Sequence, residues 1–264
     1  MKKVTFVIQG PLCIDSIRNI PNYKRLGDVV VSCWDTDSPE LFELIPDYVT
    51  VVKNKFIDPQ DYNFQNIRHQ IKTTLEGIKE AQTPYIVKVR SDEYFTRMNN
   101  FVSCVYNFPE HITVSNFLFR KKYMFHPSDH VFGGTVGNVA RMFEFSLEMI
   151  EDFYRDEKVD VERVGLSKKY TFPILTAEMT FCLSYLKTKG IDVVADIQGM
   201  SFKELKEYHK KTIKENYKLV RASDMGYFLL RFKSNPIIEE PTAFTNEQDF
   251  LNFHIGSIKS LEEL

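Results

Sequence analysis

The first part of the chain alternates between short, mostly apolar runs and polar connections. Four runs of strand length are rich in β-branched and aromatic residues, which is typical of buried strands. These predicted strands cover 4–8, 28–34, 49–52 and 85–89. Segment 16–24 predicts a short helical crossover, and apolar residues on one helical face predict a helix over 65–81. Strands that alternate with helical connections predict a parallel sheet and a nucleotide-binding half.

The second part of the chain is less regular. Its pattern predicts strands over 112–119 and 191–197 and helices over 139–154 and 173–187. Segment 203–218 is strongly charged, which predicts a solvated helix or a surface excursion. Together these elements predict an α/β protein with a mixed, mostly parallel central sheet flanked by helices.

Composition and charge exclude several classes of protein. The 264 residues include 34 Lys and Arg against 36 Asp and Glu, and this net charge of −2 gives no reason to expect a nucleic-acid partner. The four cysteines form no C-x-x-C spacing, so we expect reduced thiols in a cytosol-like compartment. No apolar run approaches the ~18 residues of a membrane span, and the start of the chain is too short for a signal segment. A soluble, cytoplasmic protein without a transmembrane segment is expected.

The segment after the strand at 85–89 carries the densest group of charged residues at a strand end. Arg90, Ser91, Asp92 and Glu93 follow that strand directly. Ligands of open α/β sheets bind at the carboxyl ends of the strands, where the strand order reverses. Carboxylates beside an arginine there suit a divalent cation, Mg²⁺ or Mn²⁺, that bridges a diphosphate. The alternative is a charged, solvated turn.

Two further turns follow the first and second predicted strands. Gly10 in the turn Gln9-Gly10-Pro11 lets a ligand approach the backbone, and Gln9 can hydrogen-bond the edge of a base. This turn is neither G-x-G-x-x-G nor a P-loop, which disfavours the dehydrogenases and kinases that carry them. Asp35 or Asp37 can accept from a ribose hydroxyl, and Asp35 is preferred because it lies closer to the strand end. An ordinary turn and a capping aspartate remain the alternatives.

Two more groups could contact phosphate or metal. Asn66, Arg68 and Gln70 lie at the start of the predicted helix over 65–81, where the dipole and the arginine attract an anion. Near the end of the chain, the imidazole of His254 could complete the coordination of a metal, and Lys259 could neutralise a diphosphate. For Arg68 an exposed position, and for His254 a structural role, are the alternatives.

The order of these features resembles a GT-A-fold glycosyltransferase and, more narrowly, the WavE-type family associated with lipopolysaccharide synthesis. The segments that carry the resemblance are 6–11, 31–35, 66–70, 88–92 and 128–134. The resemblance implies one GT-A-like, Rossmann-like domain over 1–264, with a nucleotide-binding half at 1–100 and an acceptor-binding half at 101–264. It also implies a nucleotide-sugar donor, with a UDP-sugar favoured, and a glycan acceptor. A homodimer stays open.

The resemblance places Arg90-Ser91-Asp92 where GT-A enzymes carry an Asp-x-Asp motif. Because Arg90 stands in the place of the first aspartate, Asp92 is the implied ligand of the divalent cation. The tail is similar to the His, Gly and Lys signature of glycogenin-like retaining transferases. That similarity implies that His254 is a second metal ligand and that Lys259 contacts the diphosphate.

The expected reaction is the transfer of a sugar to a hydroxyl acceptor, assisted by a divalent cation (Mn²⁺ or Mg²⁺). An inverting transferase also needs a carboxylate base, for which Asp129 and Glu178 are the candidates. Two other functions remain open. One is a metal-dependent nucleotidyltransferase or pyrophosphorylase, although the glycine- and lysine-rich phosphate loop typical of that class does not follow the first strand. The other is a non-catalytic protein that binds nucleotide sugars.

Overall fold

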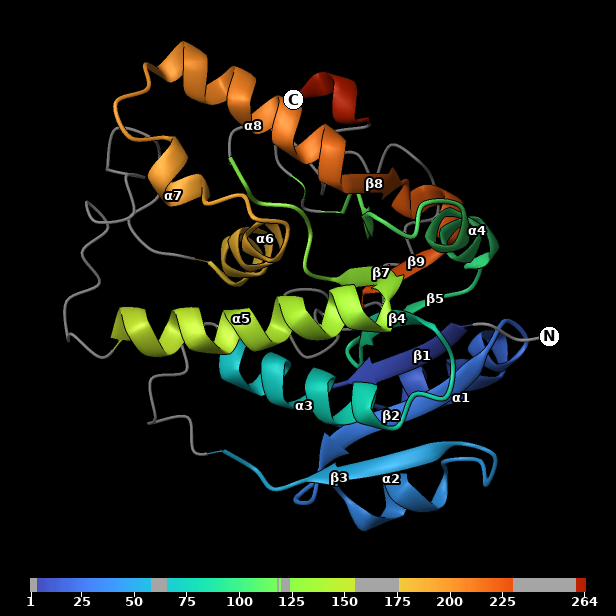
Figure 1. Ribbon diagram of the computed structural model, residues 1–264. Coiled ribbons are helices and arrows are strands. Elements are labelled where there is room, and N and C mark those ends of the chain that lie inside the picture. The colour runs from blue at the N-terminus through green and yellow to red at the C-terminus, as the bar shows by residue number, and fades with distance from the viewer. Residues whose placement is uncertain (1–3, 58–65, 118, 120–123, 155–175, 230–259) are drawn as a thin grey trace, which may run out of the picture.

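A seven-stranded sheet forms the centre of the protein in the computed structural model, which describes residues 4–57, 66–117, 119, 124–154, 176–229 and 260–264 (Figure 1). Its strand order is β3-β2-β1-β4-β7-β6-β8. The strands are β1 (Val4–Gln9), β2 (Asp28–Trp34), β3 (Thr50–Asn54), β4 (Tyr85–Arg90), β6 (Ile112–Ser115), β7 (Val131–Thr135) and β8 (Tyr217–Val220). All neighbouring strands are parallel except that β7 runs antiparallel to both β4 and β6. The predicted α/β class, with a mostly parallel sheet flanked by helices, is confirmed.

Helices cover both faces of the sheet, and the alternation of side chains along β1 shows which helix covers which face. Phe6 and Ile8 belong to a buried cluster that includes residues of α1 (Ile14–Lys24) and α4 (Asn99–Asn107). Val7 points the other way, into a cluster formed with α3 (Ile67–Lys79), α5 (Val136–Tyr154) and α6 (Ala177–Thr188). Figure 1 shows α3 and α5 on the same side of the sheet. Because successive side chains of a strand point to opposite faces of the sheet, β1 packs against one layer of helices on each face.

The remaining elements connect or border these layers. They are α2 (Pro39–Glu43), α7 (Val193–Asp196), α8 (Phe202–Asn216), the 3-10 turns η3 (Ala222–Met225) and η5 (Leu261–Glu263), and a small antiparallel sheet of β5 (Glu93–Phe95) and β9 (Tyr227–Leu229). Among the helices in the described part of the chain, none is both long enough and apolar enough to cross a membrane.

Most predicted elements are present, with some boundaries moved. The strands and the long helix of the first half match β1 to β4 and α3. The strand predicted over 191–197 is wrong, because that segment contains helix α7, whose first turn is capped by the Asp192 carboxylate accepting from Ala195 N at 3.2 Å. The charged segment 203–218 ends in β8, which pairs with β6. The helix predicted from 173 begins at Ala177, after its N-cap Thr176, and residues 173–175 lie outside the described part.

Strand β7 is not apparent in the sequence because it contains Gly133 and Gly134. Glycine weakens isolated strands, but here it lets α4 approach the sheet. A Cβ added at Gly133 would lie 2.4 Å from Val105 Cγ2 and 2.7 Å from Phe101 Cε1. The requirement for glycine therefore comes from the packing of α4, which the local pattern does not reveal.

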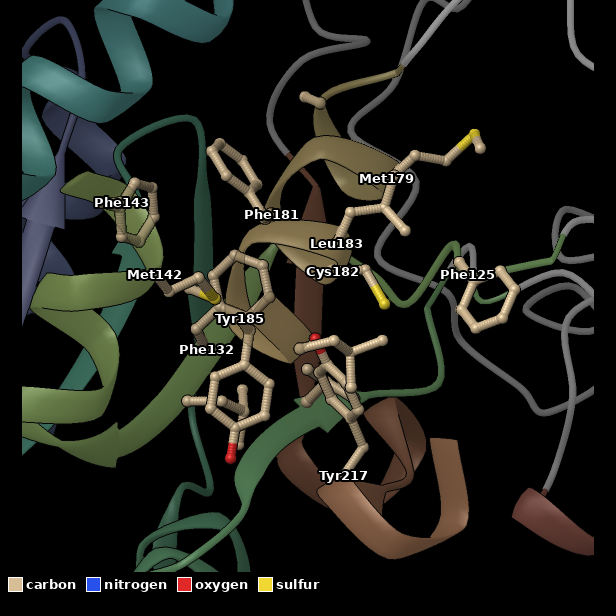
Figure 2. Packing of buried hydrophobic residues seen from close by; sticks show 14 of the residues in the cluster. Phe125, Phe132, Met142, Phe143, Met179, Phe181, Cys182, Leu183, Tyr185 and Tyr217 are labelled. Carbon is tan, nitrogen blue, oxygen red and sulfur yellow. The ribbon is translucent and has the colours of Figure 1, made fainter. Parts of the chain in front are cut away.

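Helix α6 is buried on most of its surface, and its aromatic residues join the helical layer to the sheet (Figure 2). The Phe181 ring lies 4.7 Å from that of Phe143 on α5 and 5.8 Å from that of Phe132 on β7, centroid to centroid. One turn further on, the rings of Tyr185 and Tyr217 meet edge to face at 5.4 Å. Phe181 thus fills the space between three elements.

Replacing Phe181 with alanine is expected to lower the free energy of unfolding by about 3–5 kcal/mol, because the loss of a fully buried ring leaves a cavity. Chemical denaturation of both proteins measures this difference. Phe202→Ala is the matched control, because that ring is 54% exposed on α8, and its expected cost is below about 0.5 kcal/mol. Equal losses for the two variants would contradict the central position of α6.

Candidate active site

A pocket of about 690 Å³ lies at the carboxyl edge of the parallel strands. The order of β2, β1 and β4 places β1 between strands reached by crossovers in opposite directions, so the pocket lies at the topological switch point. Because β7 is antiparallel to β4, the residues just before β7 reach the same edge. The predicted site residues that line the pocket are Gln9, Gly10, Pro11, Asn66, Gln70, Arg90, Ser91, Asp92, Asp129 and Glu178.

The turn after β1 forms the floor of the pocket and is held by backbone geometry. Gly10 has a φ of +117°, and a Cβ added there would lie 2.7 Å from Ser91 Oγ, so a side chain would be strained and would crowd Ser91. Asp37 fastens the other end of the turn: its Oδ2 accepts from Leu12 N at 3.1 Å and from Trp34 N at 2.9 Å. The turn is therefore fixed between the ends of β2 and β4 before any ligand binds.

Arg90 lies at the centre of a group of three carboxylates. Its Nε and Nη2 donate to both oxygens of Asp92 at 2.8 and 2.7 Å, while Nε lies 3.4 Å from Glu93 Oε1 and Nη1 lies 3.9 Å from Asp129 Oδ2. The Arg90 side chain is 16% exposed. Burial lowers the pKa of Arg90, but the three carboxylates outweigh burial and raise this pKa well above its ordinary value. The guanidinium is therefore a permanent cation beside the pocket.

Lys88 and Gln70 both donate hydrogen bonds to Asp129. The fully buried Lys88 donates from Nζ to the Asp129 backbone oxygen at 2.7 Å, and Gln70 Nε2 donates to Asp129 Oδ2 at 3.0 Å. Burial lowers the pKa of Lys88 to about 8, although the charge of Asp129 acts in the opposite direction. For Asp129, burial raises the pKa, but the charge of His130 in its protonated form and the charges of Arg90 and Lys88 outweigh burial, and the pKa lies below the ordinary range. Asp129 is consequently a weak base.

Two further residues complete this side of the site: Glu93, predicted only as one of the carboxylates beside Arg90, and His130, for which the sequence predicts no role. His130, which lines the pocket, hydrogen-bonds through Nδ1 to the fully buried Glu93 Oε1, and its ring stands edge to face against Phe117 at 4.4 Å. His130 Nε2 lies 3.6 Å from Asp129 Oδ1. The position of Glu93 close to Arg90 in the sequence could have identified it as a site residue. Its pairing with a histidine 37 residues away could not have been predicted from the local sequence.

Glu178 lies on the same side, in the first turn of α6. Its Oε2 is 3.6 Å from His126 Nε2, and its side chain is 17% exposed. The helix begins where Thr176 accepts from Met179 N at 3.2 Å. Asp129 and Glu178, the two predicted bases, are thus brought to one pocket, Asp129 buried and Glu178 more open.

An aromatic wall formed by Trp34, Phe56 and His69 lines the opposite end of the pocket. The three ring centroids lie 4.9 to 5.3 Å apart. His69 Nε2 is 2.8 Å from the Ile57 backbone oxygen, which orients the imidazole. Phe56 is 40% exposed, so this end of the pocket offers a braced aromatic surface to a flat ligand.

The other predicted site residues have different positions. Asp35 is exposed at the end of β2, where its Oδ1 accepts from Phe56 N at 3.2 Å, and it does not line the pocket. Arg68 lies one residue from the start of α3 and does not line the pocket either. Asn66 precedes that helix in a left-handed conformation, with a φ of 58°. His254 and Lys259 lie outside the described residues.

The described donor set does not fit a resident divalent cation. No group of three or more His, Cys, Asp or Glu side chains in the described ranges is arranged to hold a metal ion. Both oxygens of Asp92 accept from Arg90, so the guanidinium takes the place in which a cation would contact that carboxylate. Because the predicted second ligand, His254, lies outside the described residues, dependence on Mn²⁺ or Mg²⁺ stays a prediction.

Comparison with known proteins identifies one family. The family model described as WavE lipopolysaccharide synthesis matches residues 4–252, which include the whole pocket. No curated protein matches the chain.

Proposed function

Because the chain belongs to the WavE lipopolysaccharide synthesis family, we propose that it is a GT-A-type glycosyltransferase that moves a sugar from a nucleotide-sugar donor to a glycan hydroxyl. The observation that carries the proposal is the Arg90 cation, which is 16% exposed and lines the switch-point pocket. A diphosphate leaving group needs positive charge at that place.

The order of the strands suggests how the donor lies in the pocket. The ends of β3 and β2 lead into the aromatic wall of Trp34, Phe56 and His69, which suits a nucleobase. The ends of β1 and β4 bring Gly10 and Arg90 to the middle of the pocket, which suits the diphosphate. The residues before β7 and at the start of α6 then face the sugar and the acceptor.

In this arrangement Arg90 stabilises the charge that develops on the departing nucleoside diphosphate. The acceptor oxygen forms a bond to the anomeric carbon while the bond from that carbon to the diphosphate oxygen breaks, and its electron pair stays on the phosphate. Arg90 offers planar, charge-assisted donors to phosphate oxygens, at the cost of its contacts with Asp92. In this proposal the positive charge that stabilises the departing diphosphate comes from Arg90, a residue of the chain itself.

Thermal unfolding in the presence of UDP-, GDP-, dTDP- and CMP-sugars tests the proposal. At a ligand concentration 100 times its Kd, binding to the native state adds about 2.7 kcal/mol to the free energy of unfolding. We expect one sugar nucleotide to raise the melting temperature, both with Mn²⁺ and with EDTA present. No stabilisation by any of these ligands under either condition would overturn the proposed function.

Two glycine variants make the test specific for the pocket. Gly10→Ala puts a methyl group against Ser91, whereas Gly199→Ala meets no atom within 4 Å, although Gly199 also has a positive φ, of +79°. Both variants place an L residue at a positive φ, and the strain is greater at Gly10 because its φ lies further from the left-handed helical region. We expect Gly10→Ala to lose the ligand-induced shift and Gly199→Ala to retain it. A full shift in Gly10→Ala would show that the ligand binds elsewhere.

A further inference from the structure

Glu93 and His130 form a buried carboxylate–imidazole pair at the acceptor end of the pocket. The Glu93 side chain is fully buried, and its Oε1 is the partner of His130 Nδ1. An ionised carboxylate can only accept a hydrogen bond, so in the neutral imidazole Nδ1 carries the proton and the lone pair is on Nε2, which lies 3.6 Å from Asp129 Oδ1. The edge of Phe117 packs on the imidazole and restricts its rotation. The ring is therefore oriented in one tautomer within the pocket wall.

The charged groups around His130 are more negative than positive. Glu93 on β5 and Asp129 in the adjoining loop contact the ring, and Arg90 and Lys88 on β4 with the Asp92 carboxylate lie in the same network. These groups comprise three carboxylates and two cations, so the described cluster carries one surplus negative charge while His130 is neutral. This surplus is complementary to the positive charge that a base acquires when it takes a proton from an acceptor hydroxyl.

The two carboxylates predicted as bases are less suited to this task. Asp129 is 4% exposed and accepts from Gln70, and the neighbouring positive charges that keep it ionised also make it a weak proton acceptor. Glu178 lies at the start of α6 beside His126, apart from the Arg90 cluster. His130 alone among these groups combines a place in the pocket wall with a buried carboxylate that orients it.

We propose that His130 is the catalytic base of the transfer and that Glu93 is its positioning residue, a proposal that rests on the function proposed above. The acceptor hydroxyl gives its proton to His130 Nε2 as its oxygen bonds to the anomeric carbon. The electron pair of the broken glycosyl–phosphate bond leaves with the diphosphate, and the imidazolium later returns its proton to solvent.

The test uses the sugar nucleotide that stabilises the wild type most strongly and follows release of its nucleoside diphosphate, with water or an added glycan as acceptor. His130→Gln is expected to lower kcat by about 10²-fold or more, because general-base catalysis contributes about 10²–10⁴-fold. The rise in melting temperature that the donor causes should be the same in His130→Gln as in the wild type. His111→Gln is the matched control, because His111 lies outside the pocket and packs against Phe108, and its kcat should be unchanged.

The pH profile separates catalysis from a merely structural role. A general base acts only when it is unprotonated, so we expect kcat to rise with pH along a limb that His130→Gln removes, and Glu93→Gln to lower kcat with little change in KM for the donor. Glu178→Gln should leave the limb in place. If His130→Gln binds the donor and keeps full turnover, or if Glu178→Gln abolishes the limb, the proposal is overturned while the transferase function stands. If the wild type neither binds a donor nor turns it over, both the transferase function and the role of His130 are contradicted.

Discussion

Arg90→Ala is expected to lower kcat/KM for the donor by about 10³-fold, the upper end of the effect of removing one donor that stabilises a developing anion. Arg90 presents the only guanidinium among the described residues that line the pocket, and it lies where the ends of β1 and β4 meet. Arg90→Lys keeps the charge but loses the planar fork that binds two oxygens at once, so an intermediate loss is expected. Release of nucleoside diphosphate at several donor concentrations measures both variants.

The control for Arg90 is an arginine in an exposed ion pair. Arg18 lies 3.8 Å from Asp15, and its side chain is 72% exposed, so Arg18→Ala should leave donor turnover unchanged. The assay is repeated with EDTA and with Mn²⁺. Full turnover by Arg90→Ala together with complete inhibition of the wild type by EDTA would show that a metal ion, and not Arg90, supplies the positive charge.

Asp129→Ala is expected to lower the free energy of unfolding by about 3–5 kcal/mol, the usual cost of leaving a buried charge without its partner. The Asp129 carboxylate interacts with the charges of Lys88 and Arg90, and Lys88 is fully buried. Chemical denaturation measures the loss. The double variant with Lys88→Met should recover part of it, because the unpaired cation is then absent, and a coupling energy of about 0.5–3 kcal/mol is typical of such contacts.

Glu76 provides the matched ion pair for this measurement. It lies 2.7 Å from Lys79 on the surface of α3, with the two side chains 38% and 65% exposed. Glu76→Ala should cost at most about 0.5 kcal/mol, since exposed pairs on a helix contribute little. If Asp129→Ala costs no more free energy of unfolding than Glu76→Ala, Asp129 does not stabilise the buried cluster. That result would favour Asp129 as the catalytic base.

Several site residues could be predicted from the chain alone because they follow strands directly. The turn at Gly10 and the group Arg90-Ser91-Asp92 end β1 and β4, and parallel strands necessarily bring their carboxyl ends to one edge. Asp35 satisfied the same criterion and still lies outside the pocket. Its neighbour Asp37 fastens the turn instead, because which of two nearby carboxylates turns inward depends on the local hydrogen bonds.

The sequence by itself determined the class of fold, its four parallel strands and the polar ends that form the floor of the pocket. Each of these features depends on a local pattern of a few residues. Only the tertiary structure decided that β7 runs antiparallel and carries Asp129 and His130 to Arg90. It also decided that Glu93 meets a histidine from another loop and that the partner of Asp92 is a guanidinium. Pairings between distant segments depend on strand order and packing, which no single stretch of the chain contains.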